Sequence, residues 1–425
     1  MNEAGGAPSP QPLRERRIVL GVSGSIAAYR AFEIARRLQE AGATVDVALT
    51  PNASRFAPSF TFRNLVGGVV SDDLWTTDED PELHVALGRG ADALVIAPAS
   101  ATTIAKLANG IGDNLPSLTA LATTAPIAVA PAMDSVMFAN PAVQANLETL
   151  KSREVMIVGP ARGRLASGHV GLGRLAEPAE IVGATRALLG RRDGALRSRH
   201  VLVTAGGTRE AIDPVRYVGN RSSGRMGFAL AAAARDRGAA VTLVSTQEPP
   251  AGLYGVIVVR VETAAEMQAA VAKRREGIDA LIMAAAVADY RPASVAAEKM
   301  KKEPGEAGRT LALEKTADIL AEMAGAAGRR FVTVGFAAET EDLLANASRK
   351  LQAKGLDLIV ANDVSAAGSG FGSETNAVTL LAPGEEPEAL PLLHKYDVAC
   401  TILDRVAAQL DAGPLRDGPI DAPGR

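Results

Sequence analysis

Short apolar runs alternate with amphipathic stretches along most of the chain. In the first half, the apolar runs lie at Arg17–Gly21, Thr44–Leu49, Ala93–Ala97, Ile127–Ala130 and Val155–Val158. Continuous runs of this length predict strands buried on both faces, as in a parallel sheet. Between them, the spacing of apolar residues predicts helices, which are expected over Ile26–Ala41, Ser100–Ala108 and Ala179–Leu189.

The same alternation restarts after residue 200. Strands are expected at Val201–Thr204, Val241–Ser245, Val256–Val261, Ala280–Ala284, Phe331–Gly335 and Leu358–Ala361. Helices are expected at Gly224–Arg237, Ala264–Arg275 and Glu341–Lys354. Repeated strand–helix units predict an α/β fold with a mostly parallel, doubly wound sheet.

A charged stretch without periodicity separates the two halves. We therefore expect a disordered tail at 1–15, a first domain at 16–190, a linker at 191–199, a second domain at 200–411 and a tail at 412–425. The apolar run Leu118–Met133 is interrupted by Pro126 and Pro131. It therefore predicts a buried strand with its approach, and no membrane span.

Composition narrows the classes of protein. The chain has 425 residues, 47% of them hydrophobic, and a net charge of −3, which argues against nucleic-acid and anionic-membrane surfaces. The single cysteine, Cys400, excludes an intramolecular disulfide and fits a reducing cytoplasm. The four histidines are scattered, which argues against structural zinc. No secretory signal is visible near the start, and we expect a soluble protein.

Small and hydroxyl residues follow the predicted strands of the first half. Gly21–Ser25 and Ser100–Thr103 each lead into a helix, Thr50 ends the second strand, and Met133 and Asp134 follow the fourth. Ligands of open α/β sheets bind at the carboxyl ends of strands, where helix starts favour phosphate. A second glycine loop, Gly206–Thr208, predicts another phosphorylated ligand in the second half.

These segments resemble the homo-oligomeric flavin-containing cysteine decarboxylases, which are flavodoxin-like. The resemblance implies bound FMN, with the Ser-Ile-Ala turn at its phosphate. The implied FMN contacts are Gly24, Ser25, Ile26, Thr50, Ser100, Thr102 and Met133. Thr102 stands where the family usually has asparagine.

The resemblance also implies catalytic positions in this half. His84 matches a histidine beside flavin and substrate, and Asp134 stands where an asparagine holds the substrate carboxylate. Ser167 replaces a cysteine that donates a proton after decarboxylation. A serine is a much weaker acid, and Asp134 is expected to bind a carboxylate only while protonated. His169 is an alternative proton donor.

The second half combines a helix start with scattered cations. Ser222, Ser223 and Gly224 precede an alanine-rich helix and offer free N–H groups to a substrate phosphate. Lys299 lies on a charged segment, and Lys350 and Lys354 lie one helical turn apart. Lysine clusters usually lie on a solvated surface, but a bound triphosphate would explain why the chain carries these cations.

With both halves in this order, the chain resembles the bifunctional phosphopantothenoylcysteine decarboxylase/phosphopantothenate–cysteine ligases of coenzyme A biosynthesis. The resemblance implies CTP and Mg²⁺, a Rossmann-like ligase domain, and the substrates 4′-phosphopantothenate and cysteine. The implied CTP contacts are Asp289, Lys299, Lys315, Thr316, Ala317, Asp318, Phe336, Lys350 and Lys354. Lys299 would stabilise charge during activation, and Asn220 would orient the acyl intermediate. The resemblance does not indicate which residues would bind the Mg²⁺.

Three alternatives remain at this point. One is an active ligase joined to a flavin half that has lost turnover, and another is an FMN-binding regulatory protein. The third is an NAD(P)-dependent reductase, which the absence of a three-glycine fingerprint disfavours. The resemblance also implies a homo-oligomer, with trimers of the flavin half and dimers of the ligase half, and hence a dodecamer.

Overall fold

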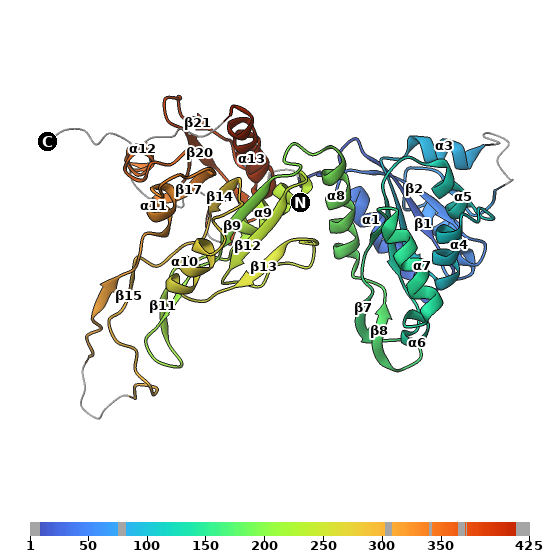
Figure 1. The fold of residues 1–425 in the computed structure, drawn as a ribbon, viewed down its shortest axis with the longest axis horizontal. Helices are drawn as coiled ribbons and strands as arrows, with labels where there is room; N and C mark the ends of the chain where they lie inside the picture. The colour runs from blue at the N-terminus through green and yellow to red at the C-terminus, as the bar shows by residue number, and fades with distance from the viewer. Residues whose placement is uncertain are drawn as a thin grey trace, which may run out of the picture. The chain divides into compact units, whose positions relative to one another are not determined.

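Figure 1 shows a computed structural model that describes residues 9–74, 82–301, 308–339, 342–363, 370 and 372–413. The chain divides into two compact units. One comprises Pro10–Gly194 with Ala251–Gly255, and the other comprises Ala195–Pro250 and the chain from Val256 onward. Residues 1–8 and 414–425 of the expected tails, and Glu341 at the start of an expected helix, lie outside the described residues.

The first unit is built on a six-stranded sheet in the order β3-β2-β1-β4-β5-β6, and every pairing is parallel. Its strands are β1 (Arg17–Val22), β2 (Thr44–Leu49), β3 (Val70–Ser71), β4 (Ala93–Ala99), β5 (Ile127–Pro131) and β6 (Met156–Ile157). All seven residues of β4 are buried, as continuous apolar runs predict. The parallel α/β fold of this half is therefore confirmed, with β3 as the strand that the sequence pattern missed.

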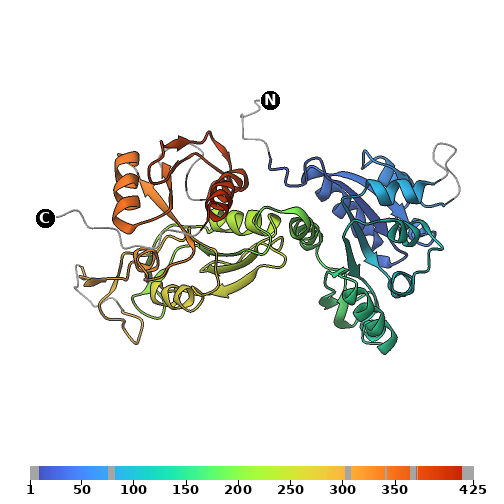
Figure 2. The same ribbon diagram turned by 45° about the horizontal axis from the view of Figure 1, so that its top comes forward.

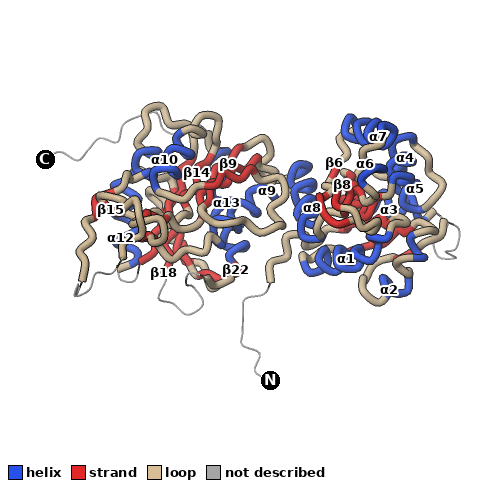
Figure 3. Tube along the Cα trace, turned by 90° about the horizontal axis from the view of Figure 1, so that it is seen from below, coloured by secondary structure: helices blue, strands red, loops and turns tan. Residues whose placement is uncertain are grey.

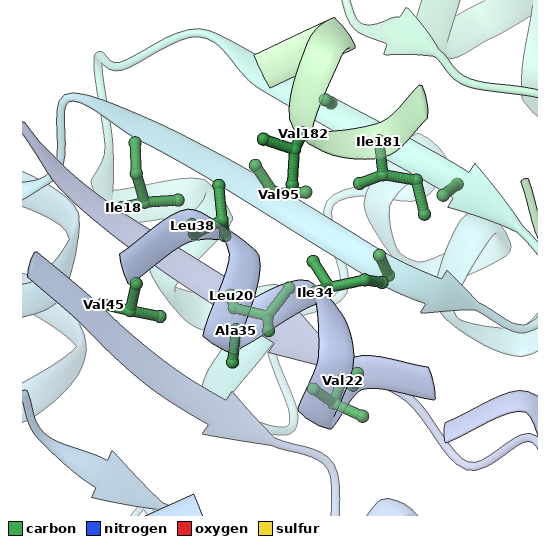
Figure 4. Close-up of a cluster of buried hydrophobic side chains, with 14 of the residues drawn as sticks. Ile18, Leu20, Val22, Ile34, Ala35, Leu38, Val45, Val95, Ile181 and Val182 are labelled. Carbon is green, nitrogen blue, oxygen red and sulfur yellow. The ribbon is translucent and has the colours of Figure 1, made fainter. Parts of the chain in front are cut away.

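Helices cover both faces of this sheet (Figure 3). They are η1 (Ile26–Arg30), α1 (Ala31–Glu40), η2 (Ala53–Arg55), α2 (Ser59–Arg63), α3 (Leu83–Gly90), α4 (Ala101–Asn109), α5 (Leu115–Ala122), α6 (Ser135–Phe138), α7 (Pro141–Ser152) and α8 (Pro178–Asp193). On one face, side chains of α1 and α8 pack on β1, β2 and β4 (Figure 4). On the other, α3, α4, α5 and α7 cover the same strands.

Four sequence expectations need correction in this unit. Leu13 is 1% exposed and packs into the core, and its N–H donates to the carbonyl of Ala41 over 2.7 Å, so residues 10–15 are not a free tail. The helix expected over Ile26–Ala41 is a 3₁₀ turn followed by α1, and the run from Leu118 begins in helix α5 instead of a strand approach. Helix α8 continues three residues into the expected linker.

An antiparallel hairpin, β7 (Ala161–Arg164) and β8 (Val170–Arg174), leaves this sheet after β6. The sequence pattern did not predict it, because the segment is rich in glycine and arginine and lacks an apolar run. Gly173 has φ +154°, and a Cβ there would lie 2.2 Å from the carbonyl oxygen of Met133. Glycine therefore lets the hairpin approach the end of β5 closely.

The second unit contains an eight-stranded sheet in the order β13-β12-β9-β14-β17-β18-β20-β21. Parallel pairings join β9 (His200–Ala205), β12 (Ala240–Ser245), β13 (Ile257–Arg260), β14 (Ala280–Met283), β17 (Val332–Glu339) and β18 (Leu358–Asp363). Beyond β18, β20 (Val378–Leu381) and the edge strand β21 (Glu388–Ala389) pair antiparallel. The doubly wound, mostly parallel sheet is therefore confirmed.

Its helices are α9 (Arg225–Asp236), α10 (Ala264–Ala272), α11 (Ile319–Ala324), α12 (Leu343–Lys354) and α13 (Lys395–Asp411). Helices α10 and α11 share a core with β9 and β14, while α9 packs against α13, the red helix beside the yellow-green one in Figure 2. Helix α13 was missed by the sequence pattern. In the described part of the chain, no helix has the length and apolarity needed to cross a bilayer.

Three two-stranded ribbons flank this sheet. They are β10 (Arg209–Ala211) with β11 (Tyr217–Gly219), β15 (Tyr290–Pro292) with β16 (Leu313–Lys315), and β19 (Thr375–Asn376) with β22 (Leu393–His394). The second ribbon brings the Lys315 segment beside the end of β14, which is where a nucleotide is expected.

Candidate active sites

A cavity of about 510 Å³ lies at the carboxyl ends of β1 and β5 in the first unit. The start of η1, the β5–α6 loop and the β7–β8 hairpin form its walls. Of the residues predicted for the flavin half, Ser25, Ile26, Met133, Asp134 and Ser167 line it. A cavity of this size, walled by strand ends, can hold a small organic ligand.

The other predicted FMN residues lie at strand ends without lining this cavity. The Thr50 hydroxyl accepts from the Ala53 N–H (3.2 Å), and the Ser100 hydroxyl accepts from the Thr103 N–H at the start of α4 (3.3 Å). Thr102 is exposed on α4. At Gly24 a Cβ would lie 2.6 Å from the Cβ of Asn52, so glycine is needed for this close approach. The contacts of these residues with a cofactor stay predictions.

Asp134 and Ser167 are joined directly. The Ser167 hydroxyl donates to Oδ2 of Asp134 over 2.7 Å, and Oδ1 accepts from the Val136 N–H over 2.9 Å at the start of α6. These two hydrogen bonds, with a smaller contribution from the charge of His169, lower the pKa of Asp134. These contacts favour the carboxylate form of Asp134, which is not the form expected to bind a substrate carboxylate.

Arginines that the sequence analysis missed also line this cavity. Glu177 accepts from Arg30 (2.7 Å) and from Arg174 (2.8 Å), and these hydrogen bonds lower the pKa of its carboxyl. Arg164 lines the cavity and, within the described ranges, makes no ion pair. A substrate anion therefore has a cation available near Asp134. In the sequence, Arg164 and Arg174 lie on either side of the loop that contains Ser167, and this position could have indicated them.

His84 is not part of this cavity. It is the second residue of α3 and is half-buried. Residues 75–81, which precede it, lie outside the described residues. Its predicted role beside flavin stays a prediction.

In the second unit, a polar cavity collects almost the whole predicted nucleotide set. It lies between the ends of β14 and β17, the β16–α11 segment and helix α12. Its lining includes the predicted residues Asn220, Asp289, Lys315, Thr316, Ala317, Asp318, Phe336, Lys350 and Lys354. Lys299 is the one predicted nucleotide contact that does not line it.

Hydrogen bonds hold the β16–α11 segment in place. The Thr316 hydroxyl donates to the Ala288 carbonyl over 2.5 Å, and Asp318 caps α11 by accepting from the Ala321 N–H over 3.0 Å. Burial alone would raise the pKa of Asp318, but the hydrogen bond from Lys354 and the α11 N–H outweigh burial and lower it. The cavity therefore contains an ionised carboxylate among several cations.

Asn220 lies where two loops meet at the end of the central strands. Its Nδ2 donates to the carbonyls of Ala286 (3.3 Å) and Val287 (3.0 Å). A Cβ at Gly207 would lie 2.4 Å from the carbonyl oxygen of Asn220. Gly207 therefore permits the approach that places Asn220 in the cavity wall.

Lys299 is exposed, and its neighbour Met300 is anchored by an ion pair whose carboxylate is buried. Asp213, whose side chain is 0% exposed, accepts from the Met300 N–H (3.2 Å), and Arg216 donates to the Met300 carbonyl (2.8 Å). The hydrogen bonds from Arg216 lower the pKa of Asp213 well below its usual range. The sequence analysis did not find this anchoring role.

A second, smaller cavity adjoins the nucleotide cavity and shares Ala285, Ala286 and Phe336 with it. The predicted phosphate residues Ser222, Ser223 and Gly224 line it at the start of α9. Gly224 is in the left-handed region (φ +75°), and no side chain caps the helix. The first N–H groups of α9 therefore remain available to an anion.

Among the described residues, the predicted Mg²⁺ has no ready-made group of acidic, histidine or cysteine ligands. Across the described ranges, no three acidic, histidine or cysteine side chains are grouped to hold a metal ion. The ion would need ligands from the nucleotide phosphates, which is the usual arrangement for Mg²⁺.

The two units define a two-domain α/β protein with a ligand cavity at the strand ends of each sheet. The flavoprotein family model matches residues 7–190, and the model of the DNA/pantothenate metabolism flavoprotein C-terminal domain matches residues 196–410. The proteins named coenzyme A biosynthesis bifunctional protein CoaBC match across both. Those of Vibrio vulnificus (over 397 residues) and Bacillus subtilis (over 402) are 44% identical, covering 93% of this chain and 98% of each relative.

The chain belongs to this family of bifunctional coenzyme A biosynthesis proteins. The resemblance found in the sequence is therefore confirmed. Among solved structures, the C-terminal domain of a CoaBC protein is 38% identical, with a TM-score of 0.43 over 52% of this chain and 100% of that domain. A mutant PPC decarboxylase complexed with pantothenoylaminoethenethiol is 35% identical, with a TM-score of 0.38 over 41% of this chain and 97% of that chain.

Proposed function

We propose that the chain catalyses two consecutive steps of coenzyme A biosynthesis. The second unit joins 4′-phosphopantothenate to cysteine at the expense of CTP. The first unit then decarboxylates 4′-phosphopantothenoylcysteine to 4′-phosphopantetheine with FMN. One observation supports this most strongly: Asn220 and eight of the nine predicted nucleotide contacts, all except Lys299, line one cavity.

In the ligase unit, different residues are suited to bind the cytosine ring, the phosphates and the acyl group. Phe336 offers a face to a base, while Lys315, Lys350 and Lys354 offer charge to phosphates. The carboxylate of 4′-phosphopantothenate would attack the α-phosphorus of CTP, releasing pyrophosphate, and the amine of cysteine would displace CMP. Asn220, fixed by two backbone carbonyls, is positioned to orient the acyl group.

In the flavin unit, the residues fit a phosphate-bearing cofactor at the start of η1, where the Ser25 hydroxyl already caps the turn. FMN, when bound, supplies the oxidation of the substrate thiol that makes loss of carbon dioxide possible. Arg164 offers a charge to the anionic substrate, and Met133 offers an apolar wall. His169 can hold a proton near Asp134 and Ser167.

A second candidate function is an active ligase joined to a flavin unit that decarboxylates slowly. The Ser167–Asp134 hydrogen bond favours it, because the hydroxyl that replaces the family's proton donor is committed to a carboxylate. An ionised Asp134 also repels a substrate carboxylate.

One assay separates the two candidates. Purified protein receives CTP, Mg²⁺, cysteine and 4′-phosphopantothenate, and pyrophosphate and carbon dioxide are followed separately. The proposal expects both products. Pyrophosphate with little or no carbon dioxide selects the second candidate. The lack of pyrophosphate overturns the ligase proposal, and the decarboxylase proposal is then tested with supplied 4′-phosphopantothenoylcysteine.

The cellular setting follows from the same proposal. The substrates are small metabolites, and the single cysteine fits a reducing cytoplasm. Trimers of the flavin unit, dimers of the ligase unit and their combination into a dodecamer stay predictions, which the mass of the purified protein in solution would test.

A further inference from the structure

The small cavity at the start of α9 has a wall that the sequence did not reveal. Lys395, the first residue of α13, lines it opposite the Ser222–Gly224 segment. The residue is 6% exposed, which is unusual because lysine is seldom buried without a partner.

The hydrogen bonds of Lys395 leave its charge without a counter-ion. Its Nζ donates to the carbonyls of Ser373 and Gly370, the latter over 3.4 Å. Both acceptors are neutral, and no carboxylate in the described part of the chain lies within ion-pair distance. A buried charge without a partner is costly.

The charges nearest to Lys395 do not remove this imbalance. Arg225 also lines the cavity, and Glu374 already pairs with Arg225 over 2.8 Å. Burial, followed by repulsion from Arg225, lowers the pKa of Lys395, and the charge of Glu374 opposes this shift without cancelling it. The uncapped start of α9 adds the positive end of a helix dipole. The cavity therefore has an excess of positive charge.

We infer that Lys395 is a binding residue of the ligase site, where its ammonium pairs with a phosphate group seated at the start of α9. The inference rests on the proposed function and extends it to a residue outside the nucleotide cavity. The phosphate belongs either to CTP or to 4′-phosphopantothenate, since the two cavities share Phe336 and both ligands carry phosphate. Lys299, by contrast, lies outside both cavities.

Steady-state kinetics of pyrophosphate release test this inference with Lys395→Met in the full chain. We expect the KM of one phosphate-bearing substrate to rise about tenfold, while kcat changes less. The reason is that the ion pair between Lys395 and the phosphate is equally strong in the ground state and the transition state, so its loss weakens binding without slowing the chemical step. The substrate whose KM rises identifies the source of the phosphate. The KM of cysteine, which has no phosphate, should not change.

Two variants guard against a general loss of structure. Lys273→Met removes an exposed lysine that follows α10 in the same unit and should leave every KM unchanged. Lys395→Arg keeps the charge and should recover part of the lost affinity. If Lys395 only ties the turn at Gly370 and Ser373, all three KM values should shift together and arginine should not rescue them; that pattern, or an unchanged KM throughout, overturns the inference.

A direct measurement separates this inference from the proposed function. Calorimetric titration of the full chain with inorganic phosphate and with pyrophosphate needs no turnover. Weaker binding to Lys395→Met than to Lys273→Met supports the inference even in a chain that releases no pyrophosphate. If the Lys395→Met protein does not fold, the same titration is made with Lys395→Arg. The larger guanidinium places the charge differently from the ammonium, so the affinity for phosphate must still change.

Discussion

The two candidate active sites differ in how completely one chain assembles them. In the ligase unit, the predicted nucleotide residues other than Lys299 come from β16, β17, α12 and the loops beside β14 and α11, yet they line one cavity. In the flavin unit, Ser25, Ile26, Met133, Asp134 and Ser167 share a cavity, while Thr50, Ser100 and Thr102 lie at other strand ends and His84 lies on α3. Residues at the carboxyl ends of neighbouring strands lie at one edge of the sheet, but they line a common cavity only where the surrounding loops close it.

The two sites also differ in chemistry. The ligase cavity keeps cations and one ionised carboxylate in an arrangement suited to a nucleotide. The flavin cavity has a carboxylate and a hydroxyl where the family has an amide and a thiol, and these two groups bond to each other. We therefore expect substitutions to separate the two activities, because each site depends on contacts within its own unit.

The largest effect is expected at Lys299. The resemblance implies that Lys299 stabilises charge during activation, so Lys299→Ala should lower pyrophosphate release by about 100-fold or more, the typical effect of removing one charge-stabilising group from a transition state. Decarboxylation of supplied 4′-phosphopantothenoylcysteine should not change. Lys301→Ala, an exposed lysine two residues away, is the matched control. An equal loss in both lysine variants would show that the segment contributes only general charge.

Asp213→Asn should come next. The substitution weakens the anchor of Met300, so ligase activity and thermal stability should both fall while the flavin spectrum is unchanged. A circular-dichroism melt and pyrophosphate release measure the two effects. Unchanged ligase activity together with a lower melting temperature would show that Asp213 has a structural role only.

The pH dependence of unfolding gives Asp213 a separate signature. Its pKa is lowered in the folded protein, so its stabilising contribution is fully present above the ordinary aspartate pKa of about 3.9 and is lost as the pH falls through the folded value. Melting temperatures of wild type and Asp213→Asn should therefore converge towards acid pH. Parallel curves across this range would contradict the assignment.

Matched glycine substitutions should separate the two units. Gly207→Ala forces a Cβ to 2.4 Å from the Asn220 carbonyl oxygen, and Gly24→Ala forces one to 2.6 Å from Asn52. Overpacking of this kind typically costs about 1–3 kcal/mol. The first variant should lower ligase activity about tenfold with flavin retained, and the second should weaken flavin binding with ligase activity retained. Loss of both activities in either variant would contradict the independence of the sites.

The smallest effect is expected at Ser167. Ser167→Cys should raise decarboxylation about threefold or more, because a thiol with a pKa near 8.5 donates a proton far more readily than a hydroxyl. Ser152→Cys, at the exposed end of α7, controls for the added thiol. An unchanged rate would point to His169 as the proton source.

The sequence predicted the strands of both sheets well, because buried parallel strands read as continuous apolar runs. It missed the β7–β8 hairpin and β3, which have no such run, and also β20, β21 and helix α13. The resemblance to the family pointed to Asn220 and the Lys315–Asp318 segment, since a family motif is a local stretch of sequence. It did not find Asp213 as an anchor or Lys395, because Met300 and the start of α9 lie far from these residues in the chain. It did not find Arg164, because only the β7–β8 hairpin brings this residue into the cavity wall.

By itself, the sequence determined two α/β units, the family and most of the residue types at both sites, because periodicity and short motifs are local properties. Tertiary structure decided which of those residues share a cavity and in what charge state. Asp134 is held as a carboxylate by Ser167, 33 residues away along the chain, and Lys395 is buried beside the start of α9 without a carboxylate partner in the described residues. Proton affinity and buried charge depend on neighbours in space, which only the fold brings together.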